Sequence, residues 1–487
     1  MKKLVSFLTV IAIIAGSCTK LDEGIYDRQV ADDFYSTPAG INAALANIYN
    51  EIRGDWNGKG YAGADRGWYD LNETNTDEMM IPTRSDGAWS DNGIWRQMYL
   101  HQWTASQEFM NNTWNWLYRS VFKSNLAVDL LTKANADPGR IAEARVTRAF
   151  FYYMLMDGWG SVPFYTQNNL TIDQIPQATR QQIFDFIVTE LTQSVDKLSP
   201  TKGGEFYSRF NKWAGYAFLA KVYLNAQVYT GTPKWTEAIA ACDKIINEGG
   251  FSLESAANYW SMFRDGAAAS NEVIWAIYVD GSKAPRNIIG IRSLHGPHGN
   301  ATIGISTWNG ATAHQDFVNK YDNTDMRKAQ WAVGPQPGGV NYQLNISSVT
   351  SAGIQEGARN IKYFPVPPYD GGTASNDFVV YRYADILLMK AEALRRTSAS
   401  GAKALVDQIR LRAGLLALAG EPTLIDIYDE RGREFAWEGH RRIDMIRFGT
   451  FLQGHDFKGV STSKYLLFPI PGPAISANPT LIQNPGY

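Results

Sequence analysis

Cysteine is nearly absent from this sequence of 487 residues, which contains only Cys18 and Cys242. Because Cys18 lies in the leader, the folded part has one thiol and no disulfide, and we expect Cys242 to be a buried, inert thiol on a helix. A basic excess is also absent, since 46 Lys and Arg face 48 Asp and Glu for a net charge of −2. Without it the chain is poorly suited to neutralise phosphates, which argues against nucleic acid as a partner.

Long hydrophobic runs are missing beyond the leader, where no stretch of 18 apolar residues could span a bilayer. The leader itself has Lys2 and Lys3 before an apolar run at 4–15, which is typical of a signal peptide. Ala15-Gly16-Ser17 then precedes Cys18 as in a lipobox, although lipoboxes more often carry Leu where Ala15 stands, and ordinary signal peptidase could also use this site.

These features predict a lipid-anchored protein. We expect residues 1–17 to be a lipoprotein signal peptide, Cys18 to be acylated (palmitate), and residues 18–38 to form the lipidated N-terminus and a tether. The acyl chains would then be the only membrane anchor.

Aromatic residues are abundant, with 15 Trp, 25 Tyr and 22 Phe. Apolar residues make up 45% and charged residues 19%, so the chain can bury a sizeable core and disorder is not expected. Cores alone rarely need so many Trp. Surface Trp and Tyr stack on sugar faces, but they also anchor protein interfaces.

Helical periodicity dominates the remainder of the chain. Small Ala residues beside large apolar ones allow close helix packing, and the apolar stripes predict four helix hairpins that resemble tetratricopeptide units. The paired segments are 41–52 with 114–133, 148–155 with 183–198, 216–224 with 235–246, and 385–394 with 402–412. The fold class is therefore mainly α, a superhelical scaffold of such hairpins with long loop insertions and a few short strands.

Long insertions separate the hairpins, and loops of this length in a compact domain are usually functional. They cover 53–113, 157–178, 249–315 and 326–377. The alternating segment 271–278 is the best candidate for a short strand.

The densest charge cluster lies between Glu430 and Arg447. Glu434 and Glu438 are one helical turn apart, which could present paired carboxylates for glycoside hydrolysis. Arg442 lies one turn further on, however, and ion pairs with arginine would keep both carboxylates ionised. A general acid needs a raised pKa. We therefore interpret the cluster as structural, name no catalytic residue, and expect no enzymatic activity.

Metal and nucleotide signatures are weak. His295 and His298 form an H-x-x-H, but Gly296-Pro297 breaks the helix that would align both rings, and the only other histidine nearby is His314. Asp70-Leu71-Asn72 lacks the turn glycine and distal Glu of an EF-hand, although a calcium site in that loop stays open. Walker, Rossmann and G-x-S-x-G contexts are missing. We predict no metal and no cofactor, with a structural calcium ion as the open alternative.

Aromatic residues stand beside polar ones in two insertions. A sugar ring offers C–H faces to an aromatic plane and hydroxyls to Asp, Asn and Arg, so glycan binding needs both kinds together. The candidate ligand-binding residues are Trp68, Tyr69, Asp70, Arg84, Asp86 and Trp89 in the first insertion, with Trp308 and Asn309 in the second. The alternative is that Trp68 or Trp89 packs its loop against the scaffold or contacts a protein partner.

Five motifs, in order along the chain, resemble the SusD/RagB family. The most specific begins Tyr381-Arg382-Tyr383-Ala384-Asp385. The matching segments are 32–37 with 43–45, 148–153 with 159–163, 381–393, 430–442, and 467–471 with 484–487. The resemblance carried by these motifs extends over essentially the whole chain after the leader.

The resemblance implies properties that composition does not show. They are a tetratricopeptide-like scaffold, surface lipidation at the outer membrane, a lid role over a SusC-like TonB-dependent transporter, and a glycan site in loops of the two parts of the chain singled out above. It also implies an N-terminal helical region at 39–270 and a C-terminal region at 271–487, packed together as one unit. The alternatives are a peptide-binding protein like the RagB branch and, in another class, a surface glycosidase.

The leader generates the first prediction. Replacing the acylated thiol in Cys18→Ala should release the protein from the membrane fraction, because the lipid on this cysteine is the predicted anchor. Fractionation and washing of membranes from cells that express each form would measure this. Persistence of the variant on washed membranes would show that something other than lipid holds it.

Overall fold

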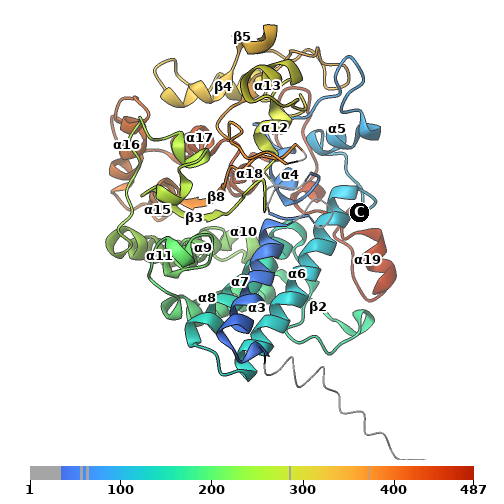
Figure 1. The fold of residues 1–487 in the computed structure, drawn as a ribbon, viewed down its shortest axis with the longest axis vertical. Coiled ribbons are helices and arrows are strands. Elements are labelled where there is room, and N and C mark those ends of the chain that lie inside the picture. Colours follow the sequence, from blue (N-terminus) through green and yellow to red (C-terminus); the bar gives the residue numbers. More distant parts are fainter. Residues whose placement is uncertain (1–33, 55–58, 62–64, 284–286, 371) are drawn as a thin grey trace, which may run out of the picture.

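The computed structural model describes residues 34–54, 59–61, 65–283, 287–370 and 372–487. Within these ranges the chain forms seventeen α-helices and a few short strands (Figure 1). The α-helices up to residue 248 are α3 (Pro38–Arg53), α4 (Trp68–Glu73), α5 (Ile94–Tyr99), α6 (Glu108–Lys133), α7 (Pro138–Trp159), α8 (Arg180–Ser194), α9 (Lys212–Leu224), α10 (Ala226–Thr230) and α11 (Trp235–Glu248).

The C-terminal half contains the remaining helices and most of the strands. Its α-helices are α12 (Ile289–Ser293), α13 (Gly296–Ile303), α14 (Gln315–Val318), α15 (Tyr383–Arg396), α16 (Ala402–Arg412), α17 (Leu424–Phe435), α18 (Arg441–Phe448) and α19 (Gly472–Ala477). The strands of the whole chain are β1 (Val162–Pro163), β2 (Gln177–Ala178), β3 (Val273–Ile277), β4 (Trp331–Ala332), β5 (Gly334–Gln336), β6 (Val340–Tyr342), β7 (Arg359–Asn360) and β8 (Phe378–Arg382).

Short 3-10 helices occur in the connecting segments. They are η1 (Asp91–Gly93), η2 (Ile172–Gln174), η3 (Val195–Lys197), η4 (Gly204–Phe206), η5 (Ser261–Phe263), η6 (Ala267–Ala269), η7 (Met326–Gln330), η8 (Pro337–Gly339) and η9 (Ser463–Leu466).

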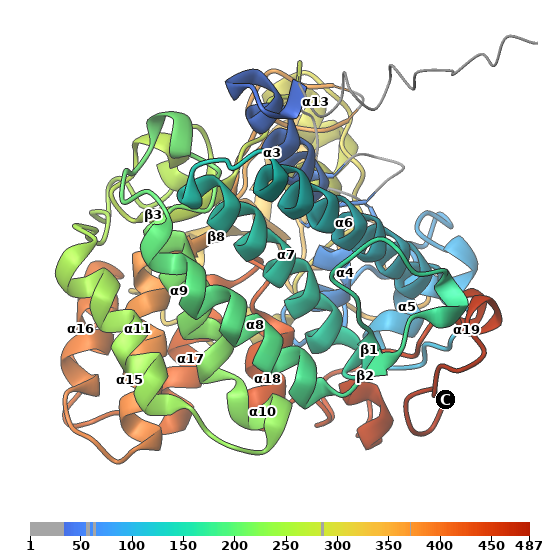
Figure 2. The ribbon, with the colours of Figure 1, turned by 90° about the horizontal axis from the view of Figure 1, so that it is seen from below.

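The long helices lie side by side in one curved row, seen from below in Figure 2. Neighbours in this row are α3 and α6, α7 and α8, α9 and α11, and α15 and α16, with α11 packed on α15. These are the four predicted hairpins, so the tetratricopeptide-like fold class is confirmed. None of the described helices combines the length and apolar character needed to cross a membrane.

Local sequence signals set where these helices begin and end. The Thr37 hydroxyl accepts the Gly40 N–H at the start of α3, and the Asp137 carboxylate accepts the Gly139 N–H at the start of α7. In both helices Pro occupies the first position, where its missing N–H is not needed. Both end at a glycine with positive φ, Gly54 (79°) and Gly160 (74°).

Helix α7 lies at the centre of the row. From Val146 to Trp159 every residue is buried, so the helix is covered on all sides and lacks an amphipathic pattern. Its aromatic residues pack against the neighbouring layers, as where the Phe150 ring contacts Trp275 of β3 with ring centroids 5.3 Å apart. Cys242 of α11 is fully buried and unpaired, as predicted, and burial raises the pKa of its thiol.

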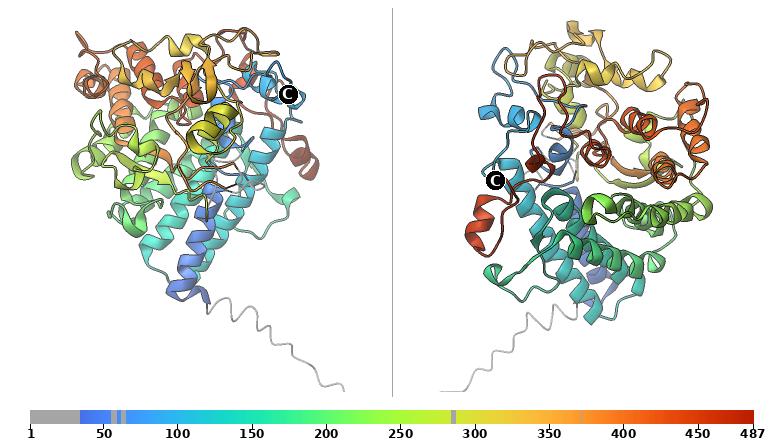
Figure 3. Two further views of the ribbon diagram at one scale, coloured as in Figure 1. Left: turned by 45° about the horizontal axis from the view of Figure 1, so that its top comes forward. Right: turned by 180° about the vertical axis from the view of Figure 1, so that it is seen from behind.

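Strand β3 lies within the predicted strand 271–278 and pairs antiparallel with β8. Helices α12 and α13 and strands β4 and β5 lie at the top of Figure 1, on the side opposite α3. The last segment returns to the N-terminal half, where α19 lies beside the 163–178 insertion and Asn478 donates to the Ile172 carbonyl at 2.9 Å (Figure 3).

A buried ion cluster joins β8 to the C-terminal helices. The Arg382 guanidinium, 1% exposed, contacts Glu434 at 2.5 Å and Glu438 at 2.8 Å. Arg327 contacts Glu434 at 2.8 Å, and Lys362 contacts Glu438 at 2.6 Å. Burial alone would raise the pKa of Glu434, but the surrounding arginines hold it well below its usual value.

This geometry is consistent with a structural role for Glu434 and Glu438, but the arginine expected to form their ion pairs is wrong. Arg442 contacts Asp157 at 2.9 Å instead of Glu438. Helix α17 ends at Phe435, so Glu438 lies beyond its last turn and is not stacked on Glu434 along one helix face. The helix ends there because Ala436 leaves the helical conformation with a ψ of 126°, and Trp437 follows with a positive φ of 61°.

A second pair of carboxylates, Glu73 and Glu78, lies in the core close to the backbone after α17. Glu78 accepts the Trp437 N–H at 2.7 Å, and Glu73 accepts the Gly439 N–H at 2.5 Å. Burial raises the pKa of Glu78 from 4.5 to about 7, and burial together with Glu78 raises the pKa of Glu73. The folded protein therefore keeps a proton at this pair that the unfolded chain releases near pH 4.5.

This pair predicts that stability falls as the pH rises. The stabilisation from the bound proton is present below pH 4.5 and is lost as the pH passes through about 7. Glu78→Gln imitates the protonated carboxyl. Between pH 5 and 7.5 its free energy of unfolding should therefore fall by about 1–3 kcal/mol less than that of the wild type. Urea unfolding across this range measures the difference, with the exposed Glu248→Gln as control. Equal pH slopes for wild type and Glu78→Gln would contradict the assignment.

Candidate functional site

Two loops from different halves of the chain meet beside α5. The loop after Ile81 carries Trp89, and the loop after α13 carries Trp308. The indole N–H of Trp89 donates to the Trp308 carbonyl at 2.8 Å. Both side chains are partly exposed. The structure therefore brings together one aromatic residue from each of the two predicted ligand-binding clusters.

The Trp89 indole is held in place by its neighbours. Its ring meets Trp95 edge-on at 5.6 Å between centroids. On another side the ring lies so close to Gly310 that a β-carbon there would stand 2.5 Å from the indole, so only glycine fits. Trp89 itself has a positive φ of 61°. A partly exposed aromatic ring fixed by its backbone and two neighbours can serve as a preformed stacking surface.

Polar groups surround this ring. Asp86, Ser90 and Asn92 are exposed in the same loop. Asp91, partly buried, accepts the indole N–H of Trp95 at 2.8 Å and contacts Arg66 at 3.4 Å. The loop thus offers carboxylate, hydroxyl and amide groups beside an aromatic ring, the combination on which the sequence prediction rested.

Arg84 anchors this surface instead of facing it. Its side chain is 1% exposed and donates to the carbonyls of Asn309 at 3.0 Å, Gly310 at 3.1 Å and Glu356 at 2.9 Å. Burial lowers its pKa well below the usual value, and Arg359 nearby adds to the effect. Backbone carbonyl dipoles therefore stabilise the charge of Arg84. None of its described hydrogen bonds goes to a carboxylate.

Asn309 belongs to the same anchor. It is 8% exposed, and its amide donates to the Ile354 carbonyl at 2.9 Å while its oxygen accepts from Arg359 at 2.7 Å. Arg359 is fully buried, and burial lowers its pKa to about 10. Together Arg84 and Arg359 fasten the 309–312 segment to the 353–357 turn, which places Trp308.

The structure corrects the expected location of Trp68, Tyr69 and Asp70. They do not lie in a loop but form α4, where each is at most 3% exposed. Asp70 contacts Arg292 of α12 at 2.9 and 2.5 Å, and the Tyr69 hydroxyl donates to the Trp437 carbonyl at 3.2 Å. Because the buried Arg292 requires a counter-ion, Asp70 serves as its partner and its oxygens are not available to calcium.

His295 and His298 also differ from expectation. Gly296-Pro297 starts α13, with Pro in its first turn, and does not break a helix. His298 is 3% exposed and its Nδ1 bonds the Tyr342 hydroxyl at 3.0 Å, while the same hydroxyl accepts the His295 N–H at 2.9 Å. Tyr342 therefore ties both residues to β6, a contact for which the local sequence carries no signal.

The described cavities lie away from these loops. A cavity of about 590 Å³ is lined by α3, the 204–209 loop and Tyr278, and an apolar one of about 370 Å³ lies between α6, the 163–175 segment and α19. Neither includes a predicted site residue. The candidate site is thus a surface platform, and of the predicted residues Asp86, Trp89 and Trp308 reach solvent there.

Comparison with known proteins identifies the family. Residues 58–224 match the family described as "Starch-binding associating with outer membrane", and residues 355–465 match the "SusD family". Starch-binding protein SusD of Bacteroides thetaiotaomicron is 24% identical over 89% of this chain and 87% of its own length. A SusD-like protein of Bacteroides ovatus is 25% identical over 93% and 83%.

Solved structures agree with the sequence matches. Surface glycan-binding protein A of B. thetaiotaomicron in complex with laminarihexaose superposes with a TM-score of 0.75 at 20% identity, over 92% of this chain and 99% of that one. The protein of the same name from Bacteroides uniformis gives a TM-score of 0.74 at 22% identity, over 92% and 99%. These structures show a shared fold, and with the family matches they establish that this chain belongs to the SusD/RagB family.

Proposed function

We propose that this protein is a surface-exposed, glycan-binding lipoprotein of the outer membrane. It captures oligo- or polysaccharide and delivers it to a SusC-like TonB-dependent transporter. The observation that carries the proposal is the aromatic platform of Trp89 and Trp308, joined by one hydrogen bond and bordered by exposed polar groups, in a chain whose structural relatives include a protein bound to laminarihexaose.

The platform matches the chemistry of a sugar chain. An indole face attracts the C–H face of a pyranose, while Asp86, Ser90 and Asn92 can exchange hydrogen bonds with hydroxyls. Buried Arg84 and Arg359 fix the loops before ligand arrives, so little ordering is needed on binding. An open surface also accommodates a polymer that extends beyond the site, which an enclosed pocket does not.

Peptide binding of the RagB type is the second candidate of the same architecture. A peptide would be held by main-chain hydrogen bonds to a strand edge or by apolar pockets for its side chains. The platform instead offers partly exposed indole rings, and the relatives described above are named for starch and glycan. These observations favour glycan.

The described carboxylates support a binding protein over a glycosidase. A general acid needs a raised pKa and contact with substrate. Glu434 and Glu438 are held ionised by basic partners, and Glu78, whose pKa rises to about 7, is 1% exposed and faces the core. None of Glu434, Glu438 and Glu78 therefore combines a raised pKa with access to a bound glycan.

The first test of this proposal uses Trp89→Ala and Trp308→Ala. Stacking of a ring on an aromatic side chain is worth roughly 1–3 kcal/mol, by analogy with bases, so each variant should bind the glycan about 10- to 100-fold more weakly. Glycan and peptide arrays identify the ligand, and calorimetry measures its affinity. Phe122→Ala, which removes a 49% exposed aromatic on α6 away from the platform, is the matched control.

Melting temperatures separate binding from folding in this experiment. Trp308→Ala should melt close to the wild type because its ring is partly exposed. Trp89→Ala should melt somewhat lower, because it also loses the hydrogen bond to the Trp308 carbonyl and the contact with Trp95, but a fully buried Trp would cost more, about 3–5 kcal/mol. Undiminished affinity in both variants would refute the platform, and enrichment of peptides over glycans on the arrays would favour the RagB-like alternative.

The second test concerns the transporter. The family implies a broad contact between the helical scaffold and a SusC-like partner, so pull-down from outer membranes in mild detergent should recover a large β-barrel protein with this chain. An unrelated outer-membrane lipoprotein carried through the same procedure controls for lipid-mediated recovery. Isolation of the chain by itself, under conditions that keep other membrane complexes intact, would count against the pairing.

A further inference from the structure

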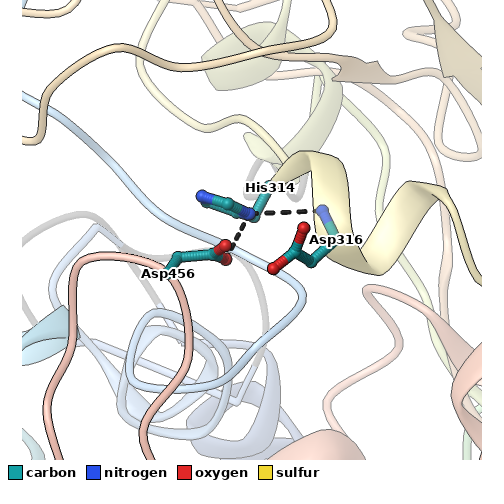
Figure 4. Close-up of side chains that lie close together, drawn as sticks. All are labelled: His314, Asp316 and Asp456. Carbon is teal, nitrogen blue, oxygen red and sulfur yellow. Dashed lines mark hydrogen bonds and ion pairs between the residues drawn. The ribbon is translucent and has the colours of Figure 1, made fainter.

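His314, Asp316 and Asp456 converge outside the aromatic platform (Figure 4). His314 immediately precedes α14, Asp316 lies in its first turn, and Asp456 lies in the 455–458 turn, where it has a positive φ of 45°. One potential ligand atom from each of the three side chains lies within 4.8 Å of the others. None of these residues takes part in the proposed glycan site.

His314 cannot satisfy all its neighbours with one proton. Its side chain is 2% exposed, and its Nδ1 forms a close contact with a carboxylate oxygen of Asp456. The same Nδ1 is also the acceptor for the Asp316 backbone N–H at 3.3 Å, and a nitrogen that accepts this bond has no proton to offer Asp456. Its lone pair then points at a negatively charged oxygen, a repulsive contact that would be relieved if a cation bound both atoms and held them further apart.

A positively charged imidazole does not resolve the conflict. His314 Nε2 is buried without a hydrogen-bond partner in the described part of the chain, so an imidazolium would leave a buried N–H unpaired. A neutral imidazole leaves two carboxylates side by side without compensation.

The nearby basic side chains have other partners. Lys320 contacts Asp77 at 3.0 Å, Arg441 contacts Asp77 at 2.6 Å, and Lys458 donates to the Gln453 carbonyl at 2.8 Å. Within the described ranges, no lysine or arginine forms an ion pair with Asp316 or Asp456. The cluster therefore combines two carboxylates and one imidazole with no compensating charge from the protein.

We propose that His314, Asp316 and Asp456 form a binding site for a divalent metal ion of the Zn²⁺ class. Imidazole nitrogen with carboxylate oxygen is a donor set that suits Zn²⁺, whereas Ca²⁺ and Mg²⁺ prefer oxygen ligands alone. Asp316 is exposed, so water can reach the ion and complete its coordination. A bound ion would cross-link α14 to the 455–458 turn, two segments about 140 residues apart, and so stabilise the fold.

The test uses the untagged full-length chain after treatment with EDTA and dialysis, titrated with Zn²⁺ in a calorimeter. One equivalent should bind, the melting temperature should rise, and Co²⁺ in place of Zn²⁺ should give visible d–d absorption. Asp316→Asn and Asp456→Asn should each weaken Zn²⁺ binding at least 10-fold. Asp322→Asn, an exposed aspartate outside the cluster, should leave it unchanged.

Asp316→Asn keeps the experiment decisive even if a variant of buried His314 fails to fold, because Asp316 is at the surface. Absence of one bound equivalent, or unchanged affinity in both aspartate variants, would overturn the site. Ca²⁺ binding as tightly as Zn²⁺ would overturn the assigned class of ion. Glycan affinity is not measured, so this outcome and that of the platform variants are independent.

Discussion

The buried carboxylates around Glu434 are the constraint on which the C-terminal half depends. Arg327, Arg382 and Arg412 converge on this one side chain from η7, β8 and α16. Each charge is costly to bury alone, and removing one partner of such a network typically costs about 3–5 kcal/mol because it leaves the others uncompensated. The network therefore favours a single arrangement of these segments, and β8 carries that arrangement to β3 and the helical row.

Buried arginines also support the aromatic platform, but there they bind uncharged oxygens instead of carboxylates. Arg84 and Arg359 are as deeply buried as Arg382, yet their described partners are backbone carbonyls, amide oxygen and a hydroxyl. A guanidinium that binds carbonyls fixes the path of a loop without demanding a particular side chain from it. Residues such as Asp86 and Ser90 can thus vary at the surface while the two loops keep their relative position.

Much of the helical scaffold could be predicted because its signals are local. Apolar periodicity located all four hairpins, and Pro and Gly mark the ends of α3 and α7. The site could be predicted only in part. The segment 53–113 is polar enough to be predicted as a surface loop. Asp70 is nevertheless buried in α4, because its charge is neutralised by Arg292, which is 222 residues away in the sequence. Likewise the sequence marks His314 only as a histidine near His295 and His298. Its contact with Asp456 could not be predicted, because Asp456 lies far along the chain.

The abundance of aromatic residues therefore has a different meaning from the one composition suggests. Among the described residues six tryptophans are fully buried, namely Trp95, Trp103, Trp116, Trp159, Trp275 and Trp437. Some pack within the row of helices, as Trp116 does against Phe151, and others join the row to further segments, as Trp275 does against Phe150. Large rigid side chains bury much area in these places at small entropic cost. Trp89 depends on that packing, because its ring rests against Trp95. The proposed platform is thus the exposed margin of the aromatic core, and its rigidity comes from the buried rings beneath it.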